Sequence, residues 1–337
     1  MPKVNEKQAK EFLNSITKKD KVAVIHHDDL DGFASGSIFY GFAKNKGARV
    51  QNFMGGYGAN VKKLLKKLDK FNKIIITDLG PGFVKTLNSV LKEKKVFYTD
   101  HHPDEKGIAK NVLELRTTDR GYLPSSRTAF ELTGLDEWKG IAGVMGDMGH
   151  KYKENDELIS SFFKKEKITA KKFLEEVVFN LNKFIIYNHK KPQIAFDFLV
   201  KLKTYKDLYK IKKKTRAVED EIQKHIKNFK KDREDFGKIK LYALDLKYPV
   251  KSTVTSVSAF KFPKSAVFMY VKNKNLVKVS GRNQGGNINV RELLQKCTEG
   301  FENAVAGGHD KASGASFHPK YFKKFKDNLK EYAKHLK

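Results

Sequence analysis

The sequence contains a single cysteine, Cys297, among its 337 residues. One cysteine cannot form an intramolecular disulfide, and it cannot build a zinc site from cysteine ligands. Any metal ion in this protein must therefore be held by histidine, aspartate or glutamate. These ligands favour Mn²⁺ or Mg²⁺ and leave zinc and iron open.

Long apolar runs are also missing. No stretch approaches the ~20 apolar residues that a membrane-spanning helix requires. The first residues are polar and charged and lack the apolar centre of a secretory signal. We therefore expect a cytoplasmic protein without a membrane anchor. With 39% hydrophobic and 12% aromatic residues, the chain can bury enough apolar surface for two folded domains.

Acidic residues are scarce relative to basic ones. Lysine and arginine number 68 against 39 aspartates and glutamates, which gives a formal net charge of +29. Such a balance attracts polyanions, of which nucleic acid is the first candidate. Because lysine is abundant throughout the chain, a general lysine bias would give the same charge without a nucleic-acid partner.

Strand and helix patterns alternate over the first hundred residues. The apolar runs typical of strands lie at 21–26, 49–54, 73–78 and 95–100. The helical patterns around them lie at 5–17, 32–46, 58–70 and 83–93. This alternation predicts an α/β fold in which residues 1–150 form a parallel sheet with helices on both faces.

The pattern changes after residue 150. Residues 151–235 contain helical stretches without alternating strands and end in a Lys-rich helix near 204–233, so we predict a helical segment that connects two domains. Its basic runs are either a solvated helix face or a track for nucleic acid. A smaller α/β domain is expected over 236–337. Its predicted elements are a strand at 238–246, a helix at 253–262, two strands within 266–281, a helix at 289–298 and a glycine-rich turn at 307–314.

Polar side chains follow directly after three of the predicted strands. These residues are His27, Asp78 and Asp100. In open α/β sheets, ligands bind outside the carboxyl ends of the strands. We therefore expect these three positions, distant in sequence, to converge at one edge of the sheet.

The motif HHDDLDG follows the first predicted strand. His27, Asp29 and Asp31 alternate in it, so in an extended chain they project from the same side. One imidazole and two carboxylates so close together are unfavourable unless a cation lies between them. Asp31 could instead serve only as the N-cap of the helix that follows Gly32.

A second cluster of metal-binding residue types is the run Asp100, His101 and His102 in TDHHP. One imidazole there can bind a metal through one ring nitrogen while a carboxylate holds the other nitrogen. Asp78 ends KIIITDLGPG, and Asp147 lies in the small-residue segment GVMGDMG. Taken alone, either aspartate could be an ordinary turn residue.

Near the end of the chain, GGHDKASG combines flexible backbone with possible phosphate donors. Paired glycines allow a backbone to approach a ligand closely, and a turn of backbone N–H groups can bind an anion. The candidate ligand-binding residues are Gly307, Gly308, His309, Lys311 and Gly314, together with Arg282. The same sequence would suit an ordinary glycine turn, and Arg282 could be a surface charge.

In this order, the five motifs resemble those of the DHH phosphoesterase superfamily. HHDDLDG is similar to its first motif, Asp78 to the second, the DHH run at 100–102 to the third, and Asp147 to the fourth. GGHDKASG resembles the hallmark of the appended DHHA1 domain. One departure is His27, which stands where RecJ-type members carry aspartate, and another is Asp28 in the variable position.

The resemblance implies two Mn²⁺ ions, or Mg²⁺ in their place, and hydrolysis of a phosphoester by water without a covalent intermediate. The implied metal ligands are His27 and Asp29 at one ion, Asp31, His101 and Asp147 at the other, and Asp78 between them. His102 would face the scissile phosphate, and Asp100 would orient an imidazole. The DHHA1-type residues would bind a terminal phosphate or nucleotide across the cleft.

Members of this superfamily act on different substrates. Our first hypothesis is an exonuclease on single-stranded DNA or short RNA, resembling archaeal RecJ-like and oligoribonuclease-like members. Aromatic residues in the Lys-rich helical segment would either stack bases or form helix core, and they are Phe162, Phe163, Phe173, Tyr205 and Tyr209. The alternative is a phosphodiesterase for cyclic dinucleotides or a 3′-phosphoadenosine nucleotide.

A non-catalytic protein of a replication complex is a further hypothesis. Whether the protein forms a homo-oligomer or binds a replication or repair partner stays open. The degenerate superfamily members of that kind should have lost part of the metal-ligand set. The complete set in this sequence argues against a purely structural role.

Overall fold

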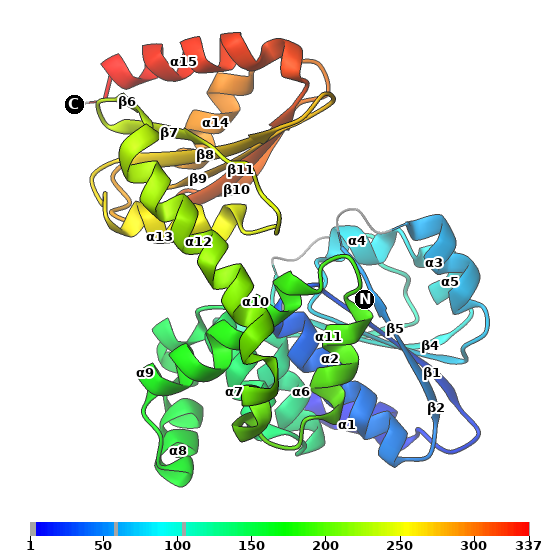
Figure 1. Ribbon diagram of the computed structural model, residues 1–337. Helices are drawn as coiled ribbons and strands as arrows, with labels where there is room; N and C mark the ends of the chain where they lie inside the picture. The colour runs from blue at the N-terminus through cyan, green and yellow to red at the C-terminus, as the bar shows by residue number, and fades with distance from the viewer. Residues whose placement is uncertain (1–4, 57–59, 103–105, 337) are drawn as a thin grey trace. The chain divides into compact units, whose positions relative to one another are not determined.

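The computed structural model describes residues 5–56, 60–102 and 106–336. The chain divides into two compact units, Met1–Lys212 and Lys213–Lys337 (Figure 1). The division falls inside the segment 151–235 that the sequence suggests as a connector, because its first helices pack into the first unit. Among the described residues, no helix is long and apolar enough to cross a membrane.

The first unit is built on a five-stranded parallel sheet in the order β2-β1-β3-β4-β5. Its strands are β1 (Lys21–His26), β2 (Arg49–Met54), β3 (Lys73–Thr77), β4 (Lys95–Asp100) and β5 (Val112–Arg116). The sequence predicts the first four and misses β5, because Glu114 and Arg116 interrupt its apolar pattern although both are buried. The strand order reverses at β1, which places the topological switch point between β1 and β3.

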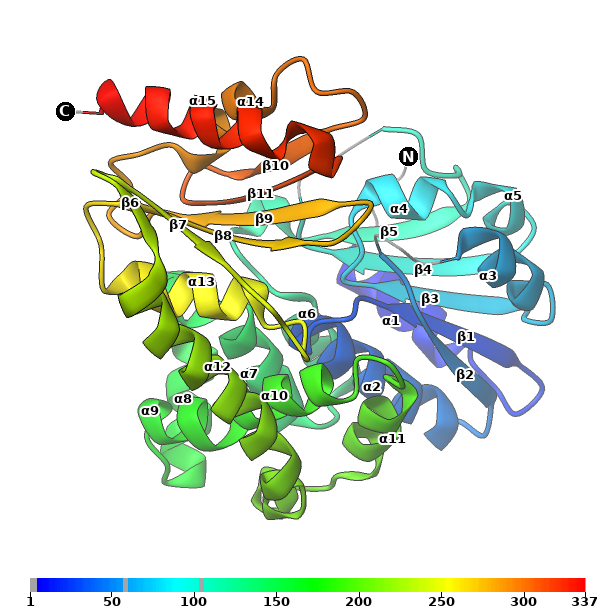
Figure 2. The ribbon, with the colours of Figure 1, turned by 45° about the horizontal axis from the view of Figure 1, so that its top comes forward.

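Helices cover both faces of this sheet, which confirms the predicted fold class. Side chains alternate along a strand, so Val24 of β1 packs on one face and Ile25 on the other. The first face is covered by α1 (Glu6–Asn14), α2 (Leu30–Asn45) and α6 (Ser125–Thr133). The second is covered by α3 (Val61–Leu68), α4 (Pro81–Lys85) and α5 (Asn88–Leu91), as Figure 2 shows.

Two helix predictions for the first unit need correction or restriction. The helix expected at 83–93 is two short helices, α4 and α5. The first begins early, at Pro81 after Gly80, and the helix is interrupted at Leu87. Positions 58 and 59 of the helix expected at 58–70 lie outside the described residues.

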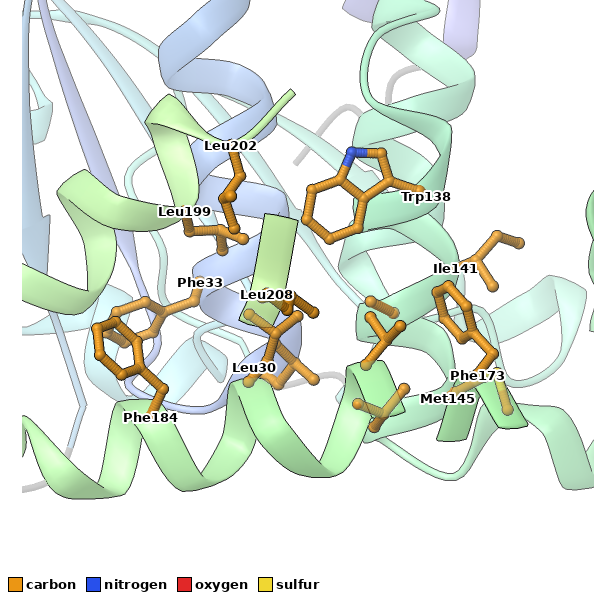
Figure 3. Close-up of a cluster of buried hydrophobic side chains, with 14 of the residues drawn as sticks. Leu30, Phe33, Trp138, Ile141, Met145, Phe173, Phe184, Leu199, Leu202 and Leu208 are labelled. Carbon is orange, nitrogen blue, oxygen red and sulfur yellow. The ribbon is translucent and has the colours of Figure 1, made fainter. Parts of the chain in front are cut away.

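The rest of the first unit is helical. Its α-helices are α7 (Glu137–Gly146), α8 (Asp156–Glu166), α9 (Ala170–Phe173), α10 (Phe179–Tyr187) and α11 (Gln193–Lys201). Short turns of other helix types are η1 (Thr118–Arg120), η2 (Gly149–Lys151), η3 (Lys153–Asn155), the π-helical turn η4 (Leu174–Val178) and η5 (Tyr205–Ile211). Figure 3 shows the apolar side chains that these helices and α2 direct into a common core, including Phe33, Trp138 and Phe184.

This core shows which of the aromatic residues in the helical segment are helix core and which are exposed. Phe162 and Phe173 are fully buried, and Phe163 and Tyr205 pack partly buried against the same cluster. These four are therefore helix core. Tyr209 differs, because 70% of it is exposed.

The second unit contains a six-stranded sheet in the order β10-β11-β9-β8-β7-β6. Its strands are β6 (Glu234–Phe236), β7 (Ile239–Ala243), β8 (Ala266–Lys272), β9 (Val277–Arg282), β10 (Val305–His309) and β11 (Ala312–Phe317). Its helices are α12 (Lys212–Asp232), α13 (Lys251–Phe260), α14 (Val290–Thr298), η6 (Pro319–Tyr321) and α15 (Phe322–Lys334). The helices α14 and α15 bury Leu293 and Phe325 against one face, while α13 lies on the other (Figure 1).

The glycine-rich segment 307–314, which the sequence predicts as a turn, is a β-hairpin formed by β10 and β11. Gly307 pairs with Gly314 and His309 with Ala312 in an antiparallel ladder, so only two residues form the turn. A hairpin can form here without large side chains because main-chain hydrogen bonds hold the two strands together. Gly308 has a φ of +131°, a conformation that residues with a Cβ rarely adopt.

Asp20, just before β1, provides a pH-dependent contribution to stability. Its carboxylate accepts hydrogen bonds from Thr17 N (2.7 Å), Asn72 Nδ2 (2.6 Å) and Lys73 Nζ (3.1 Å). Burial alone would raise the pKa of Asp20, but these hydrogen bonds outweigh burial and lower the pKa to about 2. A carboxyl group with a lowered pKa stabilises the fold above its unfolded-state pKa, and this contribution disappears as the pH falls toward 2.

We therefore expect Asp20→Asn to lower the free energy of unfolding by roughly 2 kcal/mol at neutral pH. The difference from wild type should shrink between pH ~4 and ~2, because wild-type Asp20 becomes protonated there. Urea unfolding of both proteins at pH 7, 4 and 2.5 measures this difference in the free energy of unfolding. An equal loss at all three values would contradict the assigned cause.

Candidate metal centre

Acidic and histidine side chains meet at the carboxyl ends of β1, β3 and β4. His27 Nδ1 lies 2.8 Å from Asp29 Oδ2 and 3.8 Å from Asp78 Oδ2. His101 Nε2 lies 3.2 Å from the other oxygen of Asp78. Asp78 is thus flanked by two imidazoles. The positions that follow these strands converge at the switch point of the sheet, as the strand-end argument predicts.

Asp31, His101 and Asp147 form a second group, in which one ligand atom of each lies within 4.8 Å of the others. His101 Nε2 is 3.5 Å from Asp147 Oδ2, so His101 adjoins both groups. Asp147 is the C-cap of α7, and the Tyr122 hydroxyl donates a hydrogen bond to its carboxylate. Burial and then the charge of Asp31 raise the pKa of Asp147 to about 7.

Asp31 is positioned by a distant part of the chain. Its Oδ2 accepts the backbone N–H of Ser125 at 2.7 Å, and its Oδ1 accepts that of Ser126 at 2.9 Å. Both donors lie at the start of α6, where backbone N–H groups have no partner within the helix. A carboxylate has about four acceptor positions, so these two bonds orient Asp31 and leave it able to bind a cation.

The residues of the HHDDLDG motif have different roles in the structure. Asp29, and not Asp31, is the N-cap of α2, and its side chain accepts the N–H of Gly32 at 3.0 Å. Asp28 turns outward, and 71% of its side chain is exposed. A Cβ at Gly32 would lie 2.5 Å from the carbonyl oxygen of His27. This glycine therefore lets α2 start directly against the residues of the centre.

His26 points away from its neighbour His27 and into the core. Its ring stacks on Phe196 with a centroid separation of 4.7 Å and meets Phe33 edge-on. Burial lowers the pKa of His26 to about 4, so the ring is neutral at physiological pH. The alternation in the sequence thus separates a core histidine from a histidine at the centre.

Among these residues, Asp78 fits a bound cation most clearly. The residue is 1% exposed, and among the described residues no donor forms a hydrogen bond with either of its carboxylate oxygens. Burial, followed by the charges of Asp29 and Asp31, raises its pKa well above the ordinary value. Its backbone has a φ of +58°, a left-handed conformation that aspartate tolerates better than most residues.

The donor set fits divalent cations bound by oxygen and imidazole ligands. The groups of side chains that could hold an ion are His27 with Asp29 and Asp78, Asp31 with His101 and Asp147, and Asp78 with Asp100, His101 and His102. Carboxylates that raise one another's pKa need added positive charge, and Asp78 presents two buried oxygens to receive it.

His102 is held by a buried hydrogen-bond network that includes Arg116 and Tyr98. His102 Nδ1 lies 2.7 Å from Asp100 Oδ1, while 45% of its side chain stays exposed. Arg116 Nη1 lies 2.9 Å from both Asp100 Oδ2 and the Tyr98 hydroxyl, and the guanidinium also donates to the His102 carbonyl. The hydrogen bond to Asp100 raises the pKa of His102. No pattern in the sequence singles out Arg116 or Tyr98 as members of a functional site.

The remaining predicted site residues lie in the second unit. Arg282 ends β9, and the pairing of β9, β11 and β10 aligns it in one row with Ala312 and His309. Opposite residues of antiparallel strands point to the same face, so the arginine and the imidazole share a face of the sheet. The other members of the motif are exposed or half-buried, and they are Gly307, Gly308, Lys311 and Gly314.

Two further residues adjoin Arg282 that the sequence does not indicate. Arg282 Nε donates to the Ser256 hydroxyl at 3.1 Å. Burial, and then the charges of Arg282 and Lys278, lower the pKa of Lys251 to about 8. No sequence signal singles out Lys251, since it is one of many lysines.

Gly143 of α7 faces the Asp31 carboxylate. A Cβ at this position would lie 2.9 Å from Asp31 Oδ1 and would also collide with the Ser126 hydroxyl. We expect Gly143→Ala to displace Asp31 and weaken Mn²⁺ binding by about 10- to 100-fold, as is typical when support for a metal ligand is lost. Calorimetric Mn²⁺ titration measures this. The matched control is Gly41→Ala on α2, where a Cβ meets nothing within 4 Å.

Comparison with known proteins supplies two family matches. The sequence model of the DHH family, N-terminal domain, matches residues 21–161, and that of the DHHA1 domain matches residues 250–335. No protein of curated function matches the chain.

Three of the solved structures that share the fold illustrate the similarity. The Mn²⁺ complex of RecJ from Thermus thermophilus has a TM-score of 0.78 at 17% identity, over 100% of this chain and 56% of that one. A manganese-bound exonuclease RecJ has a TM-score of 0.74 at 17% identity, over 100% and 96% of the two chains. A pGpG-specific phosphodiesterase from Vibrio cholerae has a TM-score of 0.54 at 11% identity, over 94% and 100%. The chain therefore spans little more than half of the Thermus RecJ.

Proposed function

Because the chain belongs to the DHH/DHHA1 phosphoesterase superfamily, we propose that it is a metal-dependent exonuclease that hydrolyses single-stranded DNA or short RNA to mononucleotides. The observation that carries the proposal is Asp78, a buried carboxylate that accepts no hydrogen bond from the described residues and lies between His27 and His101. Such a carboxylate is suited to binding cations, which in turn can bind a phosphate. It is not suited to a site that binds its substrate by hydrogen bonds alone.

We assign two Mn²⁺ ions to this centre, with Mg²⁺ as the substitute. The proposed ligands are His27 and Asp29 for one ion, Asp31, His101 and Asp147 for the other, and Asp78 for both. When bound, the ions would lower the pKa of the attacking water and neutralise negative charge on the phosphate.

The other residues of the centre orient their neighbours or donate hydrogen bonds. Asp100 accepts the Nδ1 hydrogen of His102, which leaves Nε2 on the exposed side of the ring. Because this hydrogen bond also raises the pKa of His102, the ring can carry a proton at Nε2. From that position it donates to a phosphate oxygen or to the departing oxygen. Tyr122 holds Asp147 in the same way that the Ser125 and Ser126 N–H groups hold Asp31.

In the second unit, we propose that Arg282 and His309 bind the terminal phosphate of the substrate, with the glycines of β10 allowing close approach of the backbone. Their shared row on the sheet supports a common ligand. Lys251 and Ser256, which adjoin Arg282, extend the same group of donors.

The second candidate is a phosphodiesterase for dinucleotides or small nucleotides. The shared fold of the pGpG-specific enzyme favours it, because the same kind of centre would serve either substrate. The formal charge of +29 favours the longer substrate, since a dinucleotide needs far fewer cationic contacts.

The deciding experiment uses end-labelled DNA and RNA oligomers of graded length, incubated with Mn²⁺ and separated by product size. Progressive shortening to mononucleotides is the expected result. Cleavage confined to dinucleotides would replace the exonuclease proposal by the second candidate. No cleavage of any phosphodiester would contradict both.

A further inference from the structure

A basic hollow lies in the helical part of the first unit. Its lining residues fall within 166–212, a stretch that neither the DHH nor the DHHA1 sequence model matches. It has a volume of about 720 Å³. It is lined by the end of α8, the loop 167–169, α9, the π-helical turn η4, the start of α10, η5 and Lys212. This volume falls within the range of pockets that bind small organic ligands, about 300–1,000 Å³. None of the proposed metal ligands lines it, so it is distinct from the metal centre.

Three of the lysines that line this hollow form no ion pair with the described residues. Within the described ranges, Lys167, Lys172 and Lys206 have no carboxylate within ion-pair distance, and all three are exposed. Two glutamates also line the hollow. The carboxylate of Glu166 accepts a hydrogen bond from the Tyr205 hydroxyl at 3.0 Å, which leaves Glu176 as the other acidic group. Lysines therefore exceed acids, and the hollow attracts anions.

An aromatic ring is exposed at the same place. Tyr209 of η5 is 70% exposed, whereas Leu208 beside it is buried and fixes η5 to the core. Lys210 Nζ lies 5.6 Å from the centre of the Tyr209 ring and 3.2 Å from Asp207. A ring that is held by its neighbours and open to solvent is a suitable platform for stacking a base.

The helix wall of the hollow contains an irregular turn. The π-helical turn η4 separates α9 from α10 and supplies Glu176 and Val177 to the lining. Single π-helical turns are rare and occur frequently at functional sites. Val177 itself is buried, so the widened turn is fixed by the core and is not a frayed end.

We propose that this hollow binds single-stranded nucleic acid, with a base stacked on Tyr209 and phosphates paired with Lys167, Lys172 and Lys206. The inference rests on the proposed function, because it adds a second attachment point for the strand that the metal centre shortens. Stacking on a single ring does not discriminate among bases, so binding is independent of sequence. Lysine contacts to phosphates make it weaken as salt is raised.

The test compares two charge-matched variants of the full chain. The first is Tyr209→Ala with Lys172→Glu and Lys206→Glu. The control is Lys70→Glu with Lys92→Glu. These two lysines line another hollow, whose aromatic lining residue, Phe71, is buried and cannot stack a base. All five changed residues are exposed, so both variants should fold, which circular dichroism checks.

Binding is measured by fluorescence anisotropy in EDTA, at low and at moderate salt. The probe is a labelled single strand of about 20 nucleotides, which is longer than one binding site. We expect the first variant to bind at least about tenfold more weakly with a smaller salt slope, and the control to change far less. Tyr209→Phe should bind like wild type, because stacking needs only the ring. An equal loss in the control, or no binding by wild type, would overturn the proposal.

Hydrolysis of a dinucleotide with Mn²⁺ separates this inference from the proposed function. A dinucleotide engages the metal centre without reaching a second attachment point, so its kcat/KM should be the same in the first variant and wild type. A loss on the dinucleotide equal to the loss on the longer strand would refute a separate binding hollow. Absence of hydrolysis of both the dinucleotide and the longer strand by wild type would refute the exonuclease proposal, while the binding measurement would still decide about the hollow.

Discussion

Replacing Asp78 by asparagine is expected to abolish Mn²⁺-dependent hydrolysis without weakening the fold. Asparagine has nearly the same shape and tolerates the left-handed backbone that position 78 requires. It removes the negative charge that the proposed ions share. We expect a loss of at least ~10³-fold in kcat/KM, which corresponds to about 4 kcal/mol of transition-state stabilisation.

The stability of the same variant should change in opposite directions with and without metal. In EDTA, wild-type Asp78 is buried among Asp29, Asp31 and Asp147, whose charges raise its pKa, so Asp78→Asn should unfold at the same or a higher temperature. With Mn²⁺, wild type gains stability because the folded state binds the ion, and the variant should gain much less.

Thermal unfolding in EDTA and at increasing Mn²⁺ measures both effects. The matched control is Asp28→Asn, since Asp28 belongs to the same motif but its side chain is 71% exposed. The control should keep both hydrolysis and the metal-dependent shift in Tm. Wild-type turnover in Asp78→Asn would refute the metal assignment, and so would an equal Mn²⁺ shift in both variants.

Local patterns in the sequence predict the sheet and the positions of the centre. Three of the four predicted apolar strands lead into polar residues, and the rule that ligands bind at the carboxyl ends of parallel strands brings His27, Asp78 and Asp100 together. The period of two along an extended chain selects His27 over His26, which the structure buries against Phe196. These predictions succeed because they depend on backbone geometry alone.

Contacts between distant segments are not visible in a single sequence. Ser125 donates its N–H to Asp31 across 94 positions, and no composition or spacing indicates that pair. The strand β5 escapes prediction because its Arg116 is charged, yet this charge is buried by pairing with Asp100. The hairpin over 307–314 resembles a turn in sequence because glycine is usual in turns. There the pairing with β9 decides the conformation.

Arg116→Met is expected to destabilise the protein by about 3–5 kcal/mol, because it leaves the Asp100 carboxylate buried without its cationic partner. The side chains of Arg116 and Asp100 are both fully buried, and Arg116 Nη1 lies 2.9 Å from Asp100 Oδ2. The exposed pair Arg120 and Glu6 gives a matched control, since Arg120→Met should cost only about 0–1 kcal/mol. Urea unfolding of both variants measures the difference.

Catalysis distinguishes a positioning role of Arg116 from a purely structural one. The double variant Arg116→Met with Asp100→Asn removes the buried charge at position 100 together with its cationic partner, so it should regain part of the lost stability. Its hydrolysis should stay low, because an amide at position 100 offers His102 a weaker hydrogen bond and no negative charge, and the His102 carbonyl has lost its donor. Recovery of kcat together with stability would show that Arg116 only supports the fold. Recovery of stability alone would show that the buried pair acts through His102.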